Sequence, residues 1–377
     1  MTRVLFVVPP FVGHVRPTVG VADALRGQGH DAAWVGDGGV LTRILPPGAS
    51  VYRSDATNLP PRPPQLRGYA ALKFLWEAIL VPLAEAMVPA VQDAVVHFDP
   101  DVLVVDQQAV AGALVAERLD RPWATSATTS SELVDPLAAM PKVRQWLTER
   151  LLDLRHRYGD PAAVHDPRFS PHLVLAFTTA ELTGEVAGPV AFVGPSLPAQ
   201  PAPDGVDPLV YVSLGTANAD AGGRFLRECV AALAARPALR AVVVDPAGAV
   251  GDPPDNVVVP RSVDQLAVLA RASVAVCHAG HNTVAEALAG GVPLVVAPIR
   301  DDQPIVAEQV TRAGAGVRLR FDRASAAQIG AALDSVLADP AYRAAAVRIR
   351  DSFQRAGGAA AAAQRISWLA SAVTAAS

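Results

Sequence analysis

Residues 277–303 read CHAGHNTVAEALAGGVPLVVAPIRDDQ, and their pattern indicates the fold class of the whole chain. The stretch begins at the end of an apolar run, Val274–Cys277, which predicts a buried strand. Small residues follow, and Asn282 and Thr283 mark the start of a helix. A second apolar run, Leu294–Ala297, leads to a polar loop that ends in an Asp-Gln pair. A strand, a helix and another strand in this order predict a parallel α/β sheet.

The same alternation of apolar runs and helical patterns extends over the rest of the chain, in two halves. In the first half we expect strands at Val4–Val8, Ala32–Val35, Val102–Val105 and Trp123–Thr125, and helices at Pro17–Gln28 and Ala109–Leu119. In the second half the pattern restarts with strands at Leu209–Ser213, Ala241–Val244 and Val257–Val259 and a helix at Arg224–Ala235. The sequence therefore predicts two similar α/β layers, with ligands at the carboxyl ends of the strands and in the cleft between the halves.

A proline-rich segment separates the two halves. Residues 197–208, LPAQPAPDGVDP, lack periodicity and are interpreted as a semi-rigid linker. The linker divides an N-terminal domain, residues 1–196, from a C-terminal domain, residues 209–350. Residues 351–377 are rich in alanine and predict a helix with a bend at Gly357 and Gly358. We expect this helix to pack back on the N-terminal domain.

Composition restricts the class of protein. The chain has 377 residues, of which 51 % are hydrophobic and 18 % charged, so it is too apolar for a disordered chain. A net charge of −4 gives no electrostatic case for nucleic acid. Cys229 and Cys277 are the only cysteines, which suits a reducing cytoplasm. No charge-free run reaches the roughly 18 residues of a membrane helix, and the apolar start, MTRVLFVVPP, is interpreted as a strand rather than a signal peptide.

The helix start near Asn282 has the chemistry of an anion site. The first N–H groups of a helix and its partial positive charge hold a diphosphate without a cation. Gly280 allows close approach of the backbone, and Asn282 and Thr283 add side-chain donors. Glu286 lies one turn further on the same face, where a carboxylate accepts hydrogen bonds from ribose hydroxyls. The alternative is that Asn282 and Thr283 only cap the helix.

The ordered array His278, Gly280, Asn282-Thr283, Glu286, Gly291-Val-Pro293, Pro298 and Asp301-Asp302-Gln303 resembles the donor-binding signature of family 1 glycosyltransferases with the GT-B fold. The resemblance covers most of the chain, beginning at Gly13-His14-x-x-Pro17, and points to bacterial natural-product enzymes of the macrolide, flavonoid or carotenoid type. It implies two Rossmann-like α/β/α domains that face each other across a cleft. It also implies that His278 binds the diphosphate, Glu286 the ribose, and Asp302 and Gln303 the sugar hydroxyls.

Two other segments belong to this implied donor site. Ser213, Gly215 and Thr216, at the end of the strand Leu209–Ser213, would face the diphosphate from the opposite wall. The family's aromatic-x-Pro-Gln segment corresponds here to Ser262-Val263-Asp264-Gln265, which lacks the aromatic residue that stacks on the base. We therefore expect the Val263 backbone to recognise the base, with Gln265 beside it, and the sequence leaves uridine and thymidine diphosphate donors both open.

A base for the acceptor is expected in the first half. Histidine, with an ordinary pKa near ~6.5, is suited to deprotonate a hydroxyl group. His14 lies in the predicted loop at the carboxyl end of the first strand, and Gly13-His14-Val-Arg-Pro17 resembles the family's catalytic loop. Asp106 ends the strand Val102–Val105 and corresponds to the family's aspartate partner. The alternative for Asp106 is the N-cap of the helix Ala109–Leu119.

The acceptor is expected to be apolar. Two predicted helices of the first half carry the large side chains Phe74, Trp76, Ile79, Met140 and Trp146, which either bind the acceptor or form ordinary core. The combined prediction is an inverting, metal-independent glycosyltransferase that moves a hexose or deoxyhexose from a dTDP- or UDP-sugar to a hydroxyl of a hydrophobic aglycone in bacterial secondary metabolism. The nucleotide sugar is a substrate, no cofactor is expected, and the sequence is compatible with a homodimer. A nucleotide-sugar epimerase and a non-catalytic partner of a glycosyltransferase are the alternatives.

Overall fold

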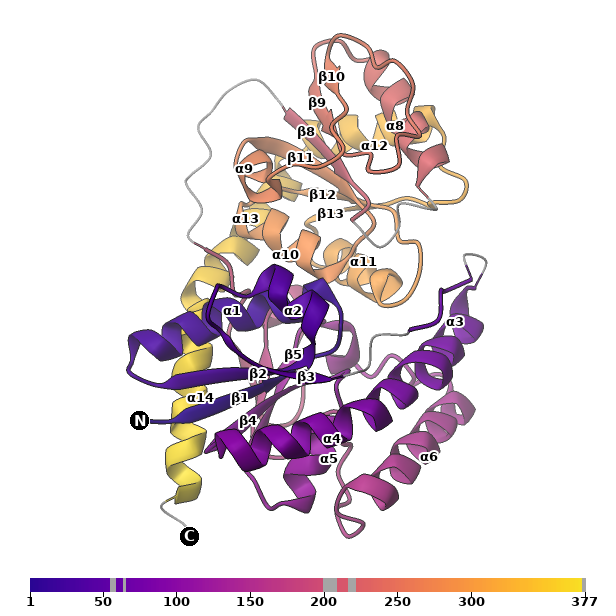
Figure 1. The fold of residues 1–377 in the computed structure, drawn as a ribbon. Coiled ribbons are helices and arrows are strands. Elements are labelled where there is room, and N and C mark those ends of the chain that lie inside the picture. The colour runs from indigo at the N-terminus through magenta and orange to yellow at the C-terminus, as the bar shows by residue number, and fades with distance from the viewer. Residues whose placement is uncertain (55–58, 64–65, 199–208, 216–221, 375–377) are drawn as a thin grey trace. The chain divides into compact units, whose positions relative to one another are not determined.

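The structure of the chain is a computed structural model that describes residues 1–54, 59–63, 66–198, 209–215 and 222–374 (Figure 1). The chain divides into two units. Unit 1 comprises Met1–Thr178, Glu185–Leu197 and Ala356–Ser377, and unit 2 comprises Thr179–Gly184 and Pro198–Arg355. Each unit contains one parallel sheet, so the prediction of two parallel α/β layers is confirmed.

Unit 1 is built on a seven-stranded sheet with the order β3-β2-β1-β4-β5-β6-β7. The strands are β1 (Arg3–Val7), β2 (Asp31–Asp37), β3 (Ser50–Ser54), β4 (Val102–Asp106), β5 (Trp123–Ala127), β6 (Val174–Ala176) and β7 (Val190–Phe192). The central strands β1, β4 and β5 are buried along nearly their whole length because helices cover both faces of the sheet. In the register, Val7 pairs with both Val35 and Val105, which brings the carboxyl ends of β1, β2 and β4 to one edge.

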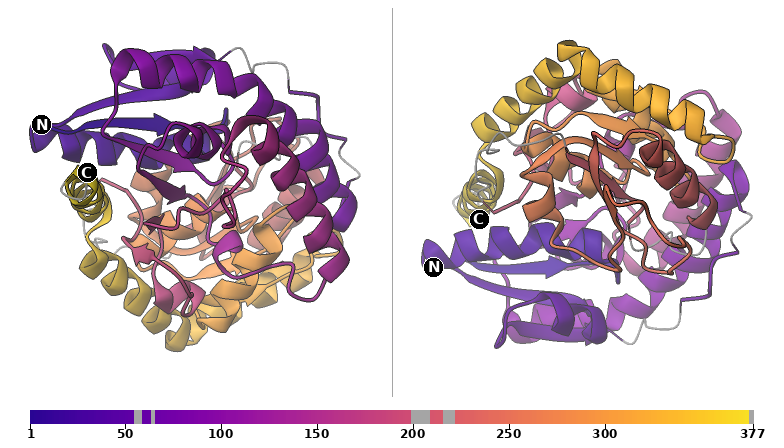
Figure 2. Two further views of the ribbon diagram at one scale, coloured as in Figure 1. Left: turned by 90° about the horizontal axis from the view of Figure 1, so that it is seen from below. Right: turned by 90° about the horizontal axis from the view of Figure 1, so that it is seen from above.

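The helices of unit 1 form two layers with separate cores. They are α1 (Val12–Gly27), α2 (Gly38–Ile44), α3 (Gly68–Phe74), a π-helical turn (Leu75–Leu80), α4 (Val81–Phe98), α5 (Ala111–Arg118), a 3-10 turn (Ser131–Leu133), α6 (Pro141–Tyr158) and α14 (Gly358–Thr374). On one face α4, α5 and α6 pack over Leu5 and Val105. On the other face α14 packs along α1, where Ile366 joins the core of Phe6 and Trp34 (Figure 2).

The continuous helical run Gly68–Phe98 is long and apolar enough to cross a membrane by length and composition. Within unit 1, however, its α4 segment forms the centre of a core, with Leu83, Met87 and Val91 fully or almost fully buried against the sheet. A buried core helix has this composition because both of its neighbours, the sheet and the next helix, are apolar.

Unit 2 is built on a six-stranded sheet with the order β10-β9-β8-β11-β12-β13. The strands are β8 (Leu209–Ser213), β9 (Arg240–Val243), β10 (Val257–Val258), β11 (Ala272–Cys277), β12 (Leu294–Val296) and β13 (Gly316–Arg318). The helices are α7 (Ala180–Thr183), α8 (Gly223–Ala234), α9 (Gln265–Leu269), α10 (His281–Ala289), α11 (Gln303–Arg312), α12 (Ala326–Ala338) and α13 (Pro340–Ala356). Cores lie on both faces, one under α10 and α11 and one under α8 and α12.

One boundary differs from the prediction in a way that concerns function. The first helix was expected to begin at about Pro17, from the spacing of apolar residues that starts at Val19. It begins at Val12 instead, and Pro17 lies inside it. The prediction that His14 lies in a loop is therefore wrong: His14 is in the first turn of α1, directly after the carboxyl end of β1.

Candidate functional site

In unit 2, three neighbouring strands end side by side and bring the expected donor residues to one edge of the sheet. Cys277 of β11 pairs with Ser213 of β8 and with Val296 of β12. The Ala297 N–H donates to the Cys277 carbonyl at 2.8 Å, which continues the pairing beyond β12. Three segments therefore leave the sheet next to one another at this edge. They contain Gly215, His278 and the loop 298–303.

Helix α10 begins where the sequence predicts an anion site. Its N-cap is Gly280, which has no side chain to cap the helix, and Asn282 and Thr283 lie inside its first turn. The alternative in which Asn282 and Thr283 are the caps is therefore wrong. The Val284 N–H already donates to the Gly280 carbonyl, so the N–H groups of the residues before Val284 are those that point out of the helix start.

The imidazole of His278 fits between two glycines. Gly215, with φ of 68°, follows β8, and a Cβ added there would lie 2.9 Å from His278 Cε1. A Cβ added at Gly280 would overlap the same ring. Both positions require glycine because any side chain would displace the ring, and at Gly215 the positive φ adds a second reason.

His278 is a neutral hydrogen-bonding group inside this edge. Its residue surface is 8 % exposed, and burial lowers the pKa of the imidazole to about 4, with the nearby Arg300 charge acting in the same direction. Nδ1 of His278 is buried without a hydrogen-bond partner among the residues that the structure describes. A buried polar atom of this kind requires a partner, and a bound ligand can supply one.

Glu286 is held by a short chain of hydrogen bonds. The Tyr211 hydroxyl donates to Gln265 Oε1 at 2.8 Å, and the Gln265 amide nitrogen donates to the Glu286 carboxylate and, at 3.5 Å, to Thr283 Oγ1. Glu286 is buried, 7 % exposed. Tyr211 was missed from the sequence, although its place in β8, two residues before Ser213 and so on the same face, could have indicated it.

The loop after β12 contains the last of the expected donor residues. Asp302 is the N-cap residue of α11, and Gln303 is its first residue. The Gln303 amide oxygen accepts hydrogen bonds from the N–H groups of Ile299, at 2.8 Å, and Arg300, at 3.0 Å. The carbonyl end of Gln303 therefore shapes the loop, and its amide nitrogen is the end that remains to donate to a ligand.

The two remaining expected donor residues are Val263 and Thr216. Val263 is half-buried against the core of unit 2 and precedes Asp264, whose side chain caps α9 by accepting from the Ala267 N–H at 3.2 Å. Ser262, at the position of the family's aromatic residue, is exposed. Thr216 lies outside the residues that the structure describes.

In unit 1, His14 and Asp106 are in direct contact. His14 Nδ1 lies 3.0 Å from each carboxylate oxygen of Asp106, which is fully buried at the end of β4. Oδ1 of Asp106 also accepts from the Gln108 N–H at 2.9 Å. Helix α5 begins at Ala111 with Val110 as its N-cap, so the alternative in which Asp106 is the N-cap of this helix is wrong.

The contact fixes the tautomer of the imidazole. An ionised carboxylate only accepts hydrogen bonds, so the proton in the His14–Asp106 contact is carried by Nδ1. In the neutral ring, Nε2 then holds the lone pair that takes up a proton. The arrangement has the chemistry of a general base with an orienting carboxylate.

Thr128 completes the polar group around His14 and was not predicted. Its Oγ1 lies 2.7 Å from Asp106 Oδ2 and 2.8 Å from His14 Nδ1. Thr128 comes two residues after Ser126, which pairs with Asp106 in the register of β4 and β5. Because side chains two residues apart share a face, this register is the signal that could have found it.

The expected acceptor residues separate into two groups. Trp76 and Ile79, 2 % and 7 % exposed, are part of the core under α4, in keeping with the core alternative for these two. Phe74 and Trp146 are only half-buried against this core, and Met140 is 44 % exposed. Tyr69, not predicted, lies edge-on to Trp146 with ring centroids 5.9 Å apart. The second group therefore leaves aromatic and thioether surface accessible on α3 and α6.

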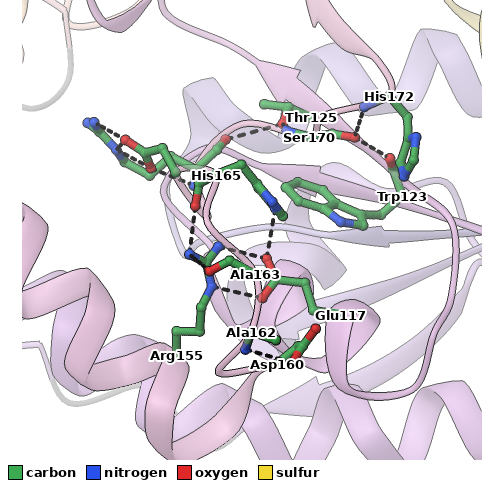
Figure 3. Close-up of polar contacts among 12 residues, drawn as sticks. Glu117, Trp123, Thr125, Arg155, Asp160, Ala162, Ala163, His165, Ser170 and His172 are labelled. Atoms are coloured by element: carbon green, nitrogen blue, oxygen red, sulfur yellow. Dashed lines mark hydrogen bonds and ion pairs between the residues drawn. The ribbon is translucent and has the colours of Figure 1, made fainter.

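A second polar cluster in unit 1 consists of Arg155, Glu117 and His165. Arg155, 1 % exposed, pairs with Glu117 at 2.9 Å and donates to the carbonyl oxygens of Ala163 and His165 (Figure 3). Nε2 of His165 lies 3.0 Å from the same Glu117 carboxylate. These contacts attach the segment after α6 to α5. Arg155 and His165 therefore belong to the framework of unit 1 and not to the His14 group.

Comparison with known proteins gives a consistent result. Residues 232–366 match the family model of the erythromycin biosynthesis protein CIII-like, C-terminal domain. The chain is 29 % identical to 4'-demethylrebeccamycin synthase of Lentzea aerocolonigenes, over 93 % of this chain and 95 % of the relative. It is also 29 % identical to demethyllactenocin mycarosyltransferase of Streptomyces fradiae, over 98 % of this chain and 87 % of the relative. The crystal structure of CalG4, the calicheamicin glycosyltransferase, is similar with a TM-score of 0.79 and 26 % identity, over 98 % of both chains.

Proposed function

The chain is a GT-B glycosyltransferase of natural-product biosynthesis, and we propose that it moves a hexose or deoxyhexose from a dTDP- or UDP-sugar, with inversion, to a hydroxyl of an apolar small molecule. The observation that carries the proposal is the contact between His14 Nδ1 and Asp106 at 3.0 Å. It supplies an oriented base, which transfer to a hydroxyl group requires and which binding of a nucleotide sugar alone does not.

The donor part of the proposal is supported by the edge of the sheet in unit 2. The start of α10 and the neutral His278 would hold the diphosphate, with Ser213 and Gly215 beside it. Glu286, oriented by Gln265, would accept from a ribose hydroxyl, and the Val263 backbone would meet the base. Asp302 and the amide nitrogen of Gln303 would bind hydroxyl groups of the sugar.

The reaction follows from the two sets of residues. Nε2 of His14 takes the proton of the acceptor hydroxyl while the acceptor oxygen attacks the anomeric carbon from the face opposite the diphosphate. The bond between the anomeric carbon and the diphosphate oxygen breaks, and the electron pair leaves with the diphosphate. The N–H groups at the start of α10 stabilise this growing negative charge, as fixed dipoles do in other enzymes. The buried carboxylate of Asp106 stabilises the imidazolium that forms.

The acceptor is proposed to be a hydrophobic aglycone of bacterial secondary metabolism. The accessible surface of Phe74, Met140 and Trp146 supports an apolar partner, with Trp76 and Ile79 packed behind it. Relatives named for rebeccamycin and lactenocin support the same class. We place the reaction in the cytoplasm, in keeping with two buried cysteines, Cys229 and Cys277, that form no disulfide.

One experiment separates this function from the two alternatives. The purified chain is incubated with dTDP- and UDP-sugars, each with and without a panel of hydrophobic alcohols, and release of nucleoside diphosphate is measured. We expect release only when both a donor and an acceptor are present. Conversion of the sugar without an acceptor would instead indicate an epimerase. No conversion of any donor, together with tight binding of a transferase subunit, would indicate an auxiliary protein.

A further inference from the structure

Thr128 contacts both members of the His14–Asp106 pair. It directly follows β5, the strand next to the one that ends in Asp106, and is 3 % exposed. Its Oγ1 is 2.7 Å from Asp106 Oδ2 and 2.8 Å from His14 Nδ1, while Nδ1 is 3.0 Å from both carboxylate oxygens. The three side chains therefore form a closed ring of hydrogen-bonding contacts.

Counting protons gives the direction of each hydrogen bond. Thr128 has one hydroxyl proton, and the ionised carboxylate of Asp106 can only accept. The Thr128 hydroxyl therefore donates to Asp106 Oδ2, and Thr128 Oγ1 accepts part of the hydrogen bond from the Nδ1–H of His14. With the Gln108 N–H on Oδ1, the Asp106 carboxylate is held at both oxygens before it meets His14.

We propose that Thr128 is a positioning residue for the base: its hydroxyl fixes the plane of the Asp106 carboxylate and the rotation of the His14 ring. The inference rests on the proposed role of His14 and adds the residue that keeps Nε2 directed at the acceptor oxygen. If the His14 ring rotates so that Nε2 moves away from the acceptor hydroxyl, the rate of transfer falls steeply, because small displacements from the productive geometry are costly.

The hydroxyl also competes with His14 for the charge of Asp106. A carboxylate that accepts an additional hydrogen bond stabilises a neighbouring imidazolium less, because part of its charge is already compensated. Removal of the Thr128 hydroxyl takes away a hydrogen bond to Asp106 and an acceptor of the His14 Nδ1–H at the same time, so the pair loses its fixed orientation.

The test compares Thr128→Val, which keeps the shape but removes the hydroxyl, with Thr128→Ser, which retains it. We expect T128V to lower kcat about 10-fold with the donor KM unchanged, because the base loses its orientation while the donor residues of unit 2 are unaltered. T128S should stay within about 3-fold of the parent enzyme. In an Asp106→Asn background, T128V should have little further effect, because the two residues act as a unit.

Thr125→Val is the matched control. Thr125 is fully buried in β5, and its hydroxyl donates to the Arg168 carbonyl and accepts from the Ser170 N–H, away from His14. T125V therefore also loses buried hydrogen bonds, but it should retain kcat. Thr128→Ala, which removes the hydroxyl without placing a second methyl group beside the carboxylate, provides the same readouts if T128V does not fold.

The failure of this inference differs from the failure of the proposed function. If His14→Ala is inactive while T128V keeps the parent kcat, Thr128 has no positioning role and the base assignment stands. If T128S loses as much rate as T128V, the effect is one of packing, and the inference is wrong. If His14→Ala retains full turnover, the base assignment itself fails, and the role of Thr128 fails with it.

Discussion

The Tyr211 hydroxyl donates to Gln265 Oε1 at 2.8 Å, and this contact determines which end of the Gln265 amide faces Glu286. With its oxygen held by Tyr211, the amide directs its nitrogen toward Thr283 and Glu286. Burial raises the pKa of Tyr211 to about 12, so the hydroxyl keeps its proton at neutral pH and remains a donor. Glu286, the carboxylate that we assign to the ribose, is thus oriented through Gln265 by Tyr211 of β8.

Replacing Tyr211 with Phe should weaken donor binding without slowing the chemical step. The substitution removes the donor to Gln265, so the amide can rotate and no longer fixes Glu286. A lost hydrogen bond of this kind is worth about 1 kcal/mol, which corresponds to a rise of about 5-fold in the donor KM. Initial rates at varied donor concentration measure this. Tyr342→Phe, at a half-buried position of the same unit, is the control, and equal KM values for the two variants would refute the prediction.

Replacing Gly215 with Ala should abolish tight donor binding. The new Cβ would lie 2.9 Å from the His278 ring and force it out of its place, so we expect the affinity for dTDP or UDP to fall by more than about 10-fold in calorimetry. Gly248→Ala is the control, because its φ of 69° matches the 68° of Gly215 while the nearest atom, in the Arg261 side chain, is 3.5 Å away. Both variants place an alanine at a positive φ and are destabilised by about 1 kcal/mol of backbone strain. Unchanged affinity in G215A would remove His278 from the donor site.

The buried His278 should make the stability of unit 2 dependent on pH. Burial lowers the pKa of the imidazole from 6.5 to about 4, so between these values the unfolded chain binds a proton that the folded chain does not. Stability therefore rises with pH from about 4 to 6.5, and His278 contributes up to about 3 kcal/mol of this difference. In His278→Gln this contribution disappears. Unfolding by urea at pH 5 and pH 7 measures it, and identical pH dependence in the two proteins would contradict the prediction.

The Arg155 network should matter for stability and not for donor binding. Arg155→Met leaves the buried carboxylate of Glu117 without its guanidinium, which costs about 3–5 kcal/mol. The double variant Glu117→Gln with Arg155→Met should be more stable than Arg155→Met alone, since it also removes the buried charge that Arg155 compensates. Thermal unfolding tests this order. A double variant less stable than Arg155→Met would show that the charge is not the source of the loss.

The sequence predicted the central strands of both sheets mainly from continuous apolar runs such as Val4–Val7 and Val102–Val105, which are buried on both faces. It did not predict β3, β6 and β7, which lie toward the outside of the sheet of unit 1. β3 is largely polar, Ser50–Ser54, and the other two are three residues long, too short to show a period. The start of α1 was missed because Pro17 is compatible with a first helical position, and local sequence does not reveal that the helix extends before it.

Most of the donor residues were predicted from one ordered array within the 26 residues 278–303, and the rest from two other segments that the family resemblance implied, whereas Tyr211 and Thr128 were not predicted. Tyr211 is 54 positions before Gln265, and Thr128 is 114 positions after His14. Contacts over such separations depend on the strand order and register of the sheet. The sequence pattern alone therefore yields the residues that meet the ligand, and the structure adds those that orient them.

The most direct test of the account is the single-turnover rate of sugar transfer in His14→Ala, measured together with the affinity for dTDP and UDP. Loss of a general base lowers the rate of the chemical step by about 10²- to 10⁴-fold, and the donor residues, all in unit 2, are not changed by the substitution. We predict a rate reduced by this amount and a nucleotide affinity equal to that of the parent enzyme. A rate within a few-fold of the parent at the same affinity would contradict the assignment of His14 as the base.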